Sequence, residues 1–117
     1  MIQVTSQMRI FVAVEPCDFR KGIDGLGGIC RNIFKEDPLS GYLFVFRNRR
    51  STSIKILAYD GQGFWLCQKR LSQGRFKWWP DGNITHELQA RDLQVLIWNG
   101  NPNETKMEPL WKPLDNV

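Results

Sequence analysis

The chain has 117 residues and a formal net charge of +4, and its 42% hydrophobic content is typical of a globular protein rather than a disordered one. This length predicts one domain with one core, because two domains would each fall near the lower size limit for independent stability. The longest apolar runs, residues 10–14 and 42–46, are too short for a membrane-spanning helix, and the N-terminal residues lack a signal-peptide pattern, so we expect a cytoplasmic protein.

The first third of the chain predicts one strand followed by one helix. Residues 10–14 are β-branched and apolar, which indicates a buried strand, and Asp18 stands where it can cap a helix. The helix is expected over about three turns, because apolar side chains recur at steps of three and four, namely Ile23, Leu26, Ile29 or Cys30, and Ile33 or Phe34. Four glycines lower its intrinsic propensity, so packing against the rest of the domain must stabilise it.

The middle of the chain has the pattern of an antiparallel meander. Turn residues occupy 36–41, and short apolar or alternating runs then recur between polar turns, which predicts strands at residues 42–46, 53–59, 64–71 and 75–78. The segment Asp60-Gly61-Gln62-Gly63 is the strongest of these turn signals.

The last third predicts a second helix and a tail. Thr85 is expected as the N-cap of a helix over residues 86–97, with Leu88, Leu93 and Leu96 on its apolar face. Residues 99–117 are polar or rich in proline, which indicates an extended or partly disordered tail. The sequence therefore predicts one α+β domain over residues 1–98, with a mostly antiparallel sheet of about five strands and two packed helices.

The positive charge is concentrated in one block of the sequence. Residues 1–41 carry five basic and five acidic side chains, and residues 80–117 carry three basic and six acidic ones. Residues 42–79 carry eight basic side chains and a single acid, Asp60. A block of this kind indicates a polyanionic partner, although an exposed sheet face with solvated lysines is the simpler alternative.

Strand alternation suggests how this block could act. Side chains two residues apart share a face of a sheet, so one face could pack on the helices while the other presents cations. Such a face could neutralise the phosphates of nucleic acid, and the candidate contact residues are Arg47, Arg49, Arg50, Lys55, Lys69, Arg70, Arg75 and Lys77. The turn that contains Arg49 and Arg50 is the sharpest part of this patch.

Two tryptophans are candidates for stacking on unpaired bases or for contact with a partner protein. Trp65 lies in a predicted strand on the side opposite Phe64 and Leu66, and Trp79 follows Trp78 directly. Because neighbouring strand residues face opposite ways, only one member of the Trp78–Trp79 pair should face the core, although both could pack around Pro80.

No catalytic or metal site is expected. Cys17, Cys30 and Cys67 form no close pair, and the single histidine, His86, has no nucleophile at a recognisable spacing. Four aspartates, Asp18, Asp24, Asp60 and Asp81, could hold a divalent metal for nuclease chemistry, but each also has a capping or turn role that explains it. The expectation is a protein without a cofactor.

Several motifs in a fixed order resemble one protein family. They are DFRKGIDGL at 18–26, DPLSGYLFVFRNRR at 37–50, IKIL at 54–57, DG at 60–61, KRL at 69–71, and GRF at 74–76 followed by Trp78. Over about residues 10–97 the chain resembles the TnpB accessory protein of the sixty-six family of bacterial insertion sequences. It departs from the family's usual pattern at residues 95–100, where VLIWNG replaces a leucine-rich acidic segment, and at Trp78–Trp79, where one tryptophan is usual.

The resemblance implies a non-enzymatic protein that acts beside a separate transposase in DNA transposition. Its expected partners are DNA at the ends of the element and the transposase, with no membrane partner, and the oligomeric state stays open. The alternatives are a module that contacts the transposase without touching DNA, and a metal-dependent nuclease.

Overall fold

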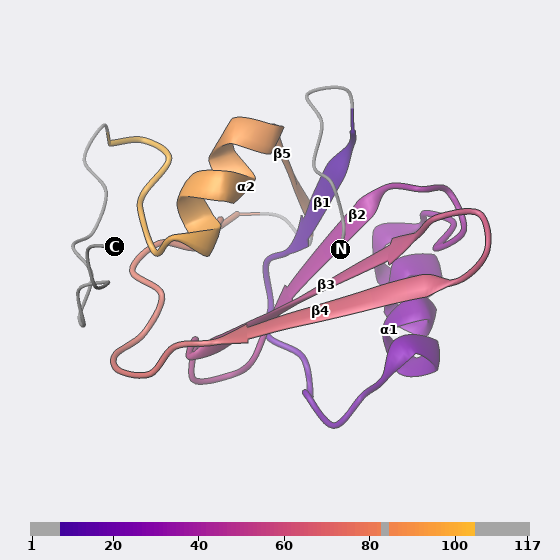
Figure 1. Cartoon of the computed structure of the whole chain (residues 1–117), viewed down its shortest axis with the longest axis horizontal. Helices are drawn as coiled ribbons and strands as arrows, with labels where there is room; N and C mark the ends of the chain where they lie inside the picture. The colour runs from indigo at the N-terminus through magenta and orange to yellow at the C-terminus, as the bar shows by residue number, and fades with distance from the viewer. Residues whose placement is uncertain (1–7, 83–84, 105–117) are drawn as a thin grey trace, which may run out of the picture.

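The protein is described by a computed structural model in which residues 8–82 and 85–104 are placed. Its centre is a five-stranded sheet with the order β4-β3-β2-β1-β5, and helices lie on either side of it (Figure 1). The strands are β1 Ile10–Ala13, β2 Leu43–Arg47, β3 Ser53–Tyr59, β4 Phe64–Arg70 and β5 Thr85–Leu88. The predicted single α+β domain with about five strands and two helices is confirmed.

Three of the four strand pairings are antiparallel. The hairpins β2·β3 and β3·β4 and the pair β1·β5 are antiparallel, whereas β1 and β2 run parallel. The parallel pair follows from the helix between these strands, since a crossover returns the chain to the same end of the sheet. This helix comprises α1, Ile23–Ile29, and a π-helical continuation η1, Cys30–Phe34, and it ends at Lys35 in a left-handed conformation.

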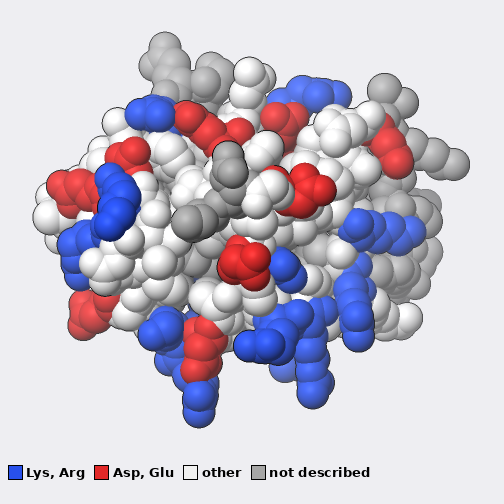
Figure 2. All heavy atoms as spheres, turned by 180° about the vertical axis from the view of Figure 1, so that it is seen from behind, with Lys and Arg blue, Asp and Glu red and all other residues white. Residues whose placement is uncertain are grey.

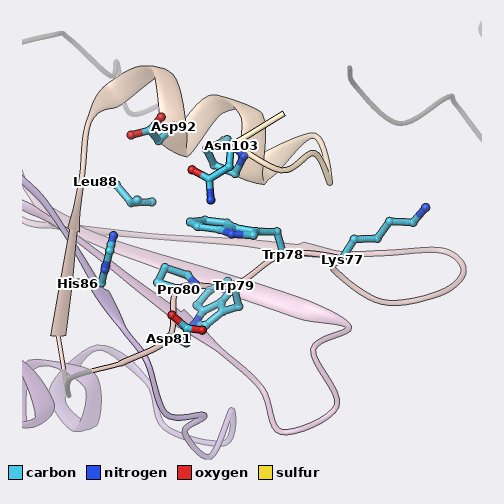
Figure 3. Close-up of a pocket in the computed structure, with 10 residues that line it drawn as sticks. Lys77, Trp78, Trp79, Pro80, Asp81, His86, Leu88, Asp92 and Asn103 are labelled. Carbon is cyan, nitrogen blue, oxygen red and sulfur yellow. The ribbon is translucent and has the colours of Figure 1, made fainter. Parts of the chain in front are cut away.

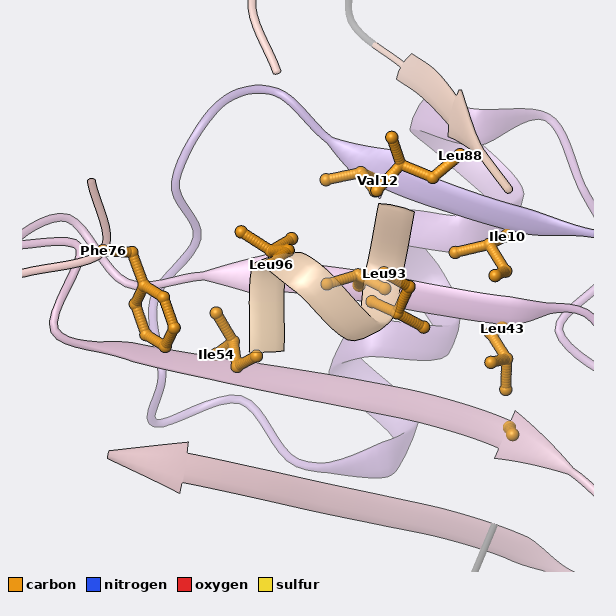
Figure 4. Packing of buried hydrophobic residues seen from close by; sticks show 10 residues of the cluster. Ile10, Val12, Leu43, Ile54, Phe76, Leu88, Leu93 and Leu96 are labelled. Carbon is orange, nitrogen blue, oxygen red and sulfur yellow. The ribbon is translucent and has the colours of Figure 1, made fainter. Parts of the chain in front are cut away.

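Both faces of the central strands are buried. α1 and η1 cover one face and bury Phe11, Ala13, Leu26, Cys30, Phe34, Phe44, Phe46 and Leu57. The second helix, α2 (Ala90–Ile97), covers the other face and inserts Leu93 and Leu96 among Ile10, Val12, Leu43, Val45 and Ile54 (Figure 4). The prediction that the meander has one helix-covered face and one open basic face is therefore wrong for β2 and β3, whereas the predicted burial of β1 is confirmed.

The first residues of the predicted second helix form a strand instead. Thr85–Leu88 pairs with β1 along its whole length, and the helix begins only at Ala90. Strand β5 supplies partners for backbone groups of β1 that would otherwise face outward, and the Glu87 carboxylate pairs with Arg9 at 2.9 Å. The helix start is then fixed by a capping box between Gln89 and Asp92.

The segment predicted as the last strand of the meander is irregular. The backbone N–H of Phe76 donates to the carbonyl of Ser51 (2.8 Å), and the ring of Phe76 is buried against α2 and the sheet. Asn99 at the end of α2 fixes the same segment, because its side chain accepts from the N–H of Lys77 (2.8 Å) and donates to the carbonyl of Arg75 (3.3 Å). The meander therefore has three strands, and β5 provides the fifth strand of the sheet.

The beginning of the predicted tail is part of the packed domain. Asn99 and Gly100 are buried, and both donate backbone hydrogen bonds to the end of α2. The rest of the prediction for residues 99–117 concerns mostly residues 105–117, which lie outside the described part of the chain. Neither described helix is long and apolar enough to cross a membrane.

Candidate nucleic-acid interface

Three loops meet at one end of the sheet. They are residues 15–21 after β1, residues 47–52 between β2 and β3, and residues 70–76 at the end of β4 (Figure 1). Backbone hydrogen bonds join them, from Cys17 N–H to the Arg47 carbonyl (3.0 Å), from Leu71 N–H to the Thr52 carbonyl (2.9 Å) and from Phe76 N–H to the Ser51 carbonyl. We call these three loops the basic end.

The basic end carries most of the concentrated positive charge. Two acidic side chains, Glu15 and Asp18, stand among seven basic ones, which are Arg20, Lys21, Arg47, Arg49, Arg50, Arg70 and Arg75. Figure 2 shows basic side chains side by side along the lower margin of the molecule, with few acidic groups among them. Six of the seven cations are exposed, and Arg47 is half-buried.

The β2–β3 turn presents two of these arginines in a fixed geometry. Asn48 organises the turn, because its Oδ1 accepts from the N–H groups of Thr52 (2.9 Å) and Ser53 (3.1 Å) and its amide donates to Thr52 Oγ1 (2.8 Å). Arg49 and Arg50 are exposed at its tip and border a groove of about 450 Å³ whose opposite wall is the loop of residues 16–20. A side chain on a braced turn loses less conformational freedom on binding than one on a loose loop.

Arg47 supports the turn from within. Its guanidinium donates to the Val14 carbonyl through Nε (3.3 Å) and Nη2 (3.1 Å) and to Ser51 Oγ through Nη1 (2.9 Å). The same group lies 5.8 Å from the ring centre of Trp79. The structure therefore places Arg47 at the basic end but gives its donors protein acceptors.

Lys55 is buried beneath the basic end. Its side chain lies on the α1 face of β3, the residue is 7% exposed, and Nζ donates to the carbonyls of Phe19 (2.8 Å) and Lys21 (3.1 Å). Nζ also lies 4.9 Å from the ring centre of Phe19. These contacts tie the loop of residues 15–21 to the sheet, so Lys55 positions one wall of the groove.

Asp18 forms an ion pair within that wall. Its carboxylate accepts from the Arg20 guanidinium at 2.7–3.1 Å and from the Arg20 N–H at 2.9 Å, so it closes a local turn instead of capping the helix as predicted. The hydrogen bond from the Arg20 side chain lowers the pKa of the Asp18 carboxyl to about 2. Asp18 is therefore ionised at neutral pH, and it offsets the charge of Arg20 at the groove.

Replacing Asp18 with asparagine should tighten the binding of duplex DNA. The change removes a negative charge beside the groove and releases the Arg20 guanidinium, and we expect a gain of about two- to fivefold at low salt, the range for one exposed charge interaction. Fluorescence anisotropy with a labelled duplex measures this gain. Asp24→Asn, an equal charge change at the first turn of α1, is the control and should give a smaller gain; an equal gain from both would leave no specific role for the pair at Asp18.

The remaining predicted contact residues are divided between the basic end and the α2 side. Arg70 and Arg75 are exposed at the basic end. Lys69 faces α2, where Nζ donates to the carbonyl of Ile97 (2.6 Å) and lies 5.1 Å from the ring centre of Trp98, and burial lowers the pKa of its ammonium group. Lys77 is exposed and borders a second groove.

The two candidate stacking residues lie apart from the groove at Arg49 and Arg50. Trp65 is 42% exposed, and its Nε1 donates to the Asp60 carboxylate at 2.8 Å, near the β3–β4 turn at the opposite end of the sheet. Trp79 is half-buried, and its Nε1 donates to the Ala13 carbonyl at 2.9 Å. Trp98, which the sequence did not single out, is the most exposed tryptophan among the described residues, at 56%.

The second groove has a different lining, in which the charged side chains are Lys77, Asp81 and Asp92. It has a volume of about 390 Å³ and lies between residues 77–81, β5 and α2. Trp78 projects into it, with Asp92 on the α2 side and Trp79 and Asp81 on the other, and His86 of β5 borders it (Figure 3). An indole face close to two carboxylates is suited to a cationic side chain.

The aspartates considered for metal binding are spread over the molecule. Asp60 accepts from the N–H groups of Gln62 (2.9 Å) and Gly63 (3.0 Å) and from Trp65, and these hydrogen bonds lower its pKa. Asp18 is engaged by Arg20, and Asp81 borders the second groove. Among the described residues, no three His, Cys, Asp or Glu side chains come close enough together to hold a metal ion.

Comparison with known proteins identifies the family. The family described as IS66 Orf2 like protein matches residues 8–106. The chain belongs to this family. It is 38% identical over 117 residues to the uncharacterized protein y4hO of Sinorhizobium fredii (strain NBRC 101917 / NGR234), covering 97% of this chain and 96% of y4hO, and 30% identical over 113 residues to the uncharacterized protein y4jC of the same strain, covering 97% of each. No solved structure matches significantly.

Membership of the IS66 Orf2-like family supports an accessory role related to transposition. The family match spans all three loops of the basic end and the second groove. The sequence singles out Arg49 and Arg50 as candidates but does not indicate that the loop of residues 15–21 lies beside them. The contacts that hold this loop near the turn join residues more than 30 positions apart, so they leave no local pattern in the sequence. The charge of Arg20 and Lys21 is the one local sign that the loop belongs to the basic end.

Proposed function

We propose that the protein assists transposition by binding DNA at the ends of the insertion sequence, or the complex of that DNA with the transposase, through the basic end. Arg49, Arg50, Arg70 and Arg75 contact phosphates, Arg47 and Lys55 position the loops, and the protein itself carries out no chemical step. It acts in the cytoplasm, where the element's DNA lies.

The observation that carries this proposal is the grouping of cations on braced loops. Four exposed arginines from two loops share one end of the sheet, and a third loop, tied down by Lys55, completes the groove beside Arg49 and Arg50. Cations held in this way can neutralise phosphates and release the counterions condensed on DNA, which is the main source of affinity in non-specific complexes. In this proposal the basic end contacts the DNA phosphates, whereas the sequence alone suggested an open face of the sheet for this contact.

The salt dependence of DNA binding tests this proposal. Four phosphate contacts should give a slope of about −3.6 for the logarithm of the association constant against the logarithm of salt concentration, or a decrease of about 150-fold between 50 and 200 mM salt. Titrations of an element-end duplex at several salt concentrations measure the slope. A slope near zero, or no binding at 50 mM salt, would refute phosphate contact by the basic end.

The second groove favours a second candidate function, direct contact with the transposase. Trp78, Asp81 and Asp92 would accept an arginine or lysine side chain of a partner protein. Co-purification with the transposase before and after nuclease digestion separates the two functions. An association bridged by DNA disappears on digestion, whereas direct protein contact persists and should then be weakened by Asp92→Asn.

A further inference from the structure

Strand β4 forms one edge of the sheet. It pairs with β3 over seven residues, and no other described strand pairs with its outer side. Edge strands are commonly protected by proline, by a bulge or by very short length. β4 is as long as β3, contains no proline and is in continuous register with β3, so its outer edge is suited to receiving another strand.

The alternation of hydrogen bonds defines which groups of β4 face outward. Asp60 N–H donates to the Gly63 carbonyl (3.1 Å) at one end of the β3·β4 ladder, and Leu71 N–H donates to the Thr52 carbonyl at the other. In an antiparallel pair every second residue bonds the neighbouring strand, so the odd-numbered residues of β4 bond β3. The N–H and C=O groups of the even-numbered residues, Phe64, Leu66, Gln68 and Arg70, therefore point to the open edge.

We propose that a second copy of this chain pairs with this edge, antiparallel, with the two-fold axis at Cys67. Leu66 of one copy then lies opposite Gln68 of the other, and Phe64 opposite Arg70. Both pairs consist of residues whose backbone groups point outward, as the hydrogen-bonded positions of an antiparallel ladder require. All seven residues of β4 are paired in this register, and the two sheets join into one of ten strands.

The side chains are complementary in the same register. On the α1 face Phe64 lies opposite the partner copy's Arg70, an exposed cation suited to an aromatic ring. On the α2 face Trp65 lies opposite the partner copy's Lys69, whose ammonium group stays on Ile97 and Trp98 of its own chain, so no like charges meet in this register. Charged residues on an edge strand usually oppose pairing because like charges meet. Moving the axis to Lys69 would place two lysines opposite each other and leave Phe64 and Trp65 without partners in β4, which disfavours that register.

The partly exposed Cys67 provides a direct test, because it would sit opposite its own copy. Cα atoms of a non-hydrogen-bonded antiparallel pair are about 4.5 Å apart, within the range that a disulfide can bridge. Diamide, which takes up the two thiol hydrogens, should convert wild type and Cys17→Ser to a disulfide dimer but leave Cys67→Ser monomeric on a non-reducing gel. Gln68→Cys in a Cys67→Ser background is the register control, since its Cα atoms would be about 8 Å apart, beyond disulfide reach.

A proline at the outward position should block the interface while sparing the fold. Gln68→Pro removes an N–H that faces the open edge, and an edge strand tolerates proline at such a position. Gln68→Ala is the control, because it retains that N–H. Sedimentation of the full chain from about 10 µM to about 1 mM should show a reversible dimer for wild type and Gln68→Ala, the range expected of a small interface. Gln68→Pro should raise the dissociation constant at least about tenfold.

Three results would overturn the proposal. They are a wild-type protein that is monomeric at every concentration, a disulfide dimer that forms through Cys17 instead of Cys67, and a dimer that Gln68→Pro leaves unchanged. If circular dichroism shows that Gln68→Pro is unfolded, the diamide test alone decides the register. Wild-type Cys67 should then form the disulfide dimer, and Gln68→Cys in the Cys67→Ser background should not. DNA binding is not needed for any of these measurements, so they are independent of the proposed function.

Discussion

Replacing Arg49 and Arg50 together with alanine should weaken binding to duplex DNA by about 60-fold at 0.1 M salt. Each phosphate contact contributes about 0.9 to the salt slope, so the slope of the double variant should be smaller in magnitude than the wild-type slope by about 1.8. Both side chains are exposed at the tip of the β2–β3 turn, and Asn48 organises that turn through its own side chain, so the fold should be retained. Anisotropy titrations at several salt concentrations measure both quantities.

A matched control separates this effect from a reduction of overall charge. Arg31→Ala with Arg91→Ala removes two exposed arginines from η1 and α2, outside the basic end, and changes the net charge equally. We expect the affinity of this variant to fall by less than about threefold, with an almost unchanged slope. Equal decreases in the two double variants would mean that net charge, and not the β2–β3 turn, governs binding.

Replacing Lys55 with methionine should lower the free energy of unfolding by about 2 kcal/mol, because the change deprives the carbonyls of Phe19 and Lys21 of a charged hydrogen-bond donor. Methionine nearly matches the length of the lysine stem and avoids placing a charge in this buried position, so packing should be largely preserved. Urea unfolding followed by circular dichroism measures the difference. DNA affinity should also fall, since the loop of residues 15–21 then loses its contacts with Lys55 and keeps only the hydrogen bond between Cys17 and Arg47 among those described above.

The control for Lys55→Met is Lys21→Met, which removes an exposed lysine from the loop of residues 15–21, the loop that Lys55 contacts. Stability should then change by less than about 0.5 kcal/mol, as is usual for surface substitutions. If Lys55→Met leaves stability unchanged and lowers only DNA affinity, Lys55 is a direct phosphate contact, as the sequence had suggested, and the positioning role is wrong.

The parts of the fold that sequence predicts well are those with a local signal. Alternation along β4 correctly separates Phe64 and Leu66 from Trp65, Cys67 and Lys69, because the pleat of a strand fixes side-chain direction. The continuous apolar run of β2 carries a further local signal. A strand without polar alternation is typical of a sheet covered on both faces, and β2 buries Phe44 on one face and Val45 on the other.

The parts that sequence missed depend on contacts between distant segments. Strand β5 has four residues, of which Leu88 alone is hydrophobic, and only pairing with β1 about 75 positions earlier makes it a strand. The role of Lys55 is equally non-local, since its acceptors lie more than 30 residues away. A lysine in a predicted amphipathic strand is usually solvated, and nothing next to it in the sequence indicates that a loop folds over it.

Amide chemical-shift mapping of the isotope-labelled protein with an element-end duplex at low salt tests the central claim most directly. The account predicts that the largest shifts fall in residues 15–21, 47–52 and 70–76, with small changes in η1 and α2. Shifts centred on the groove at Trp78 and His86, or spread evenly over exposed lysines and arginines, would contradict it.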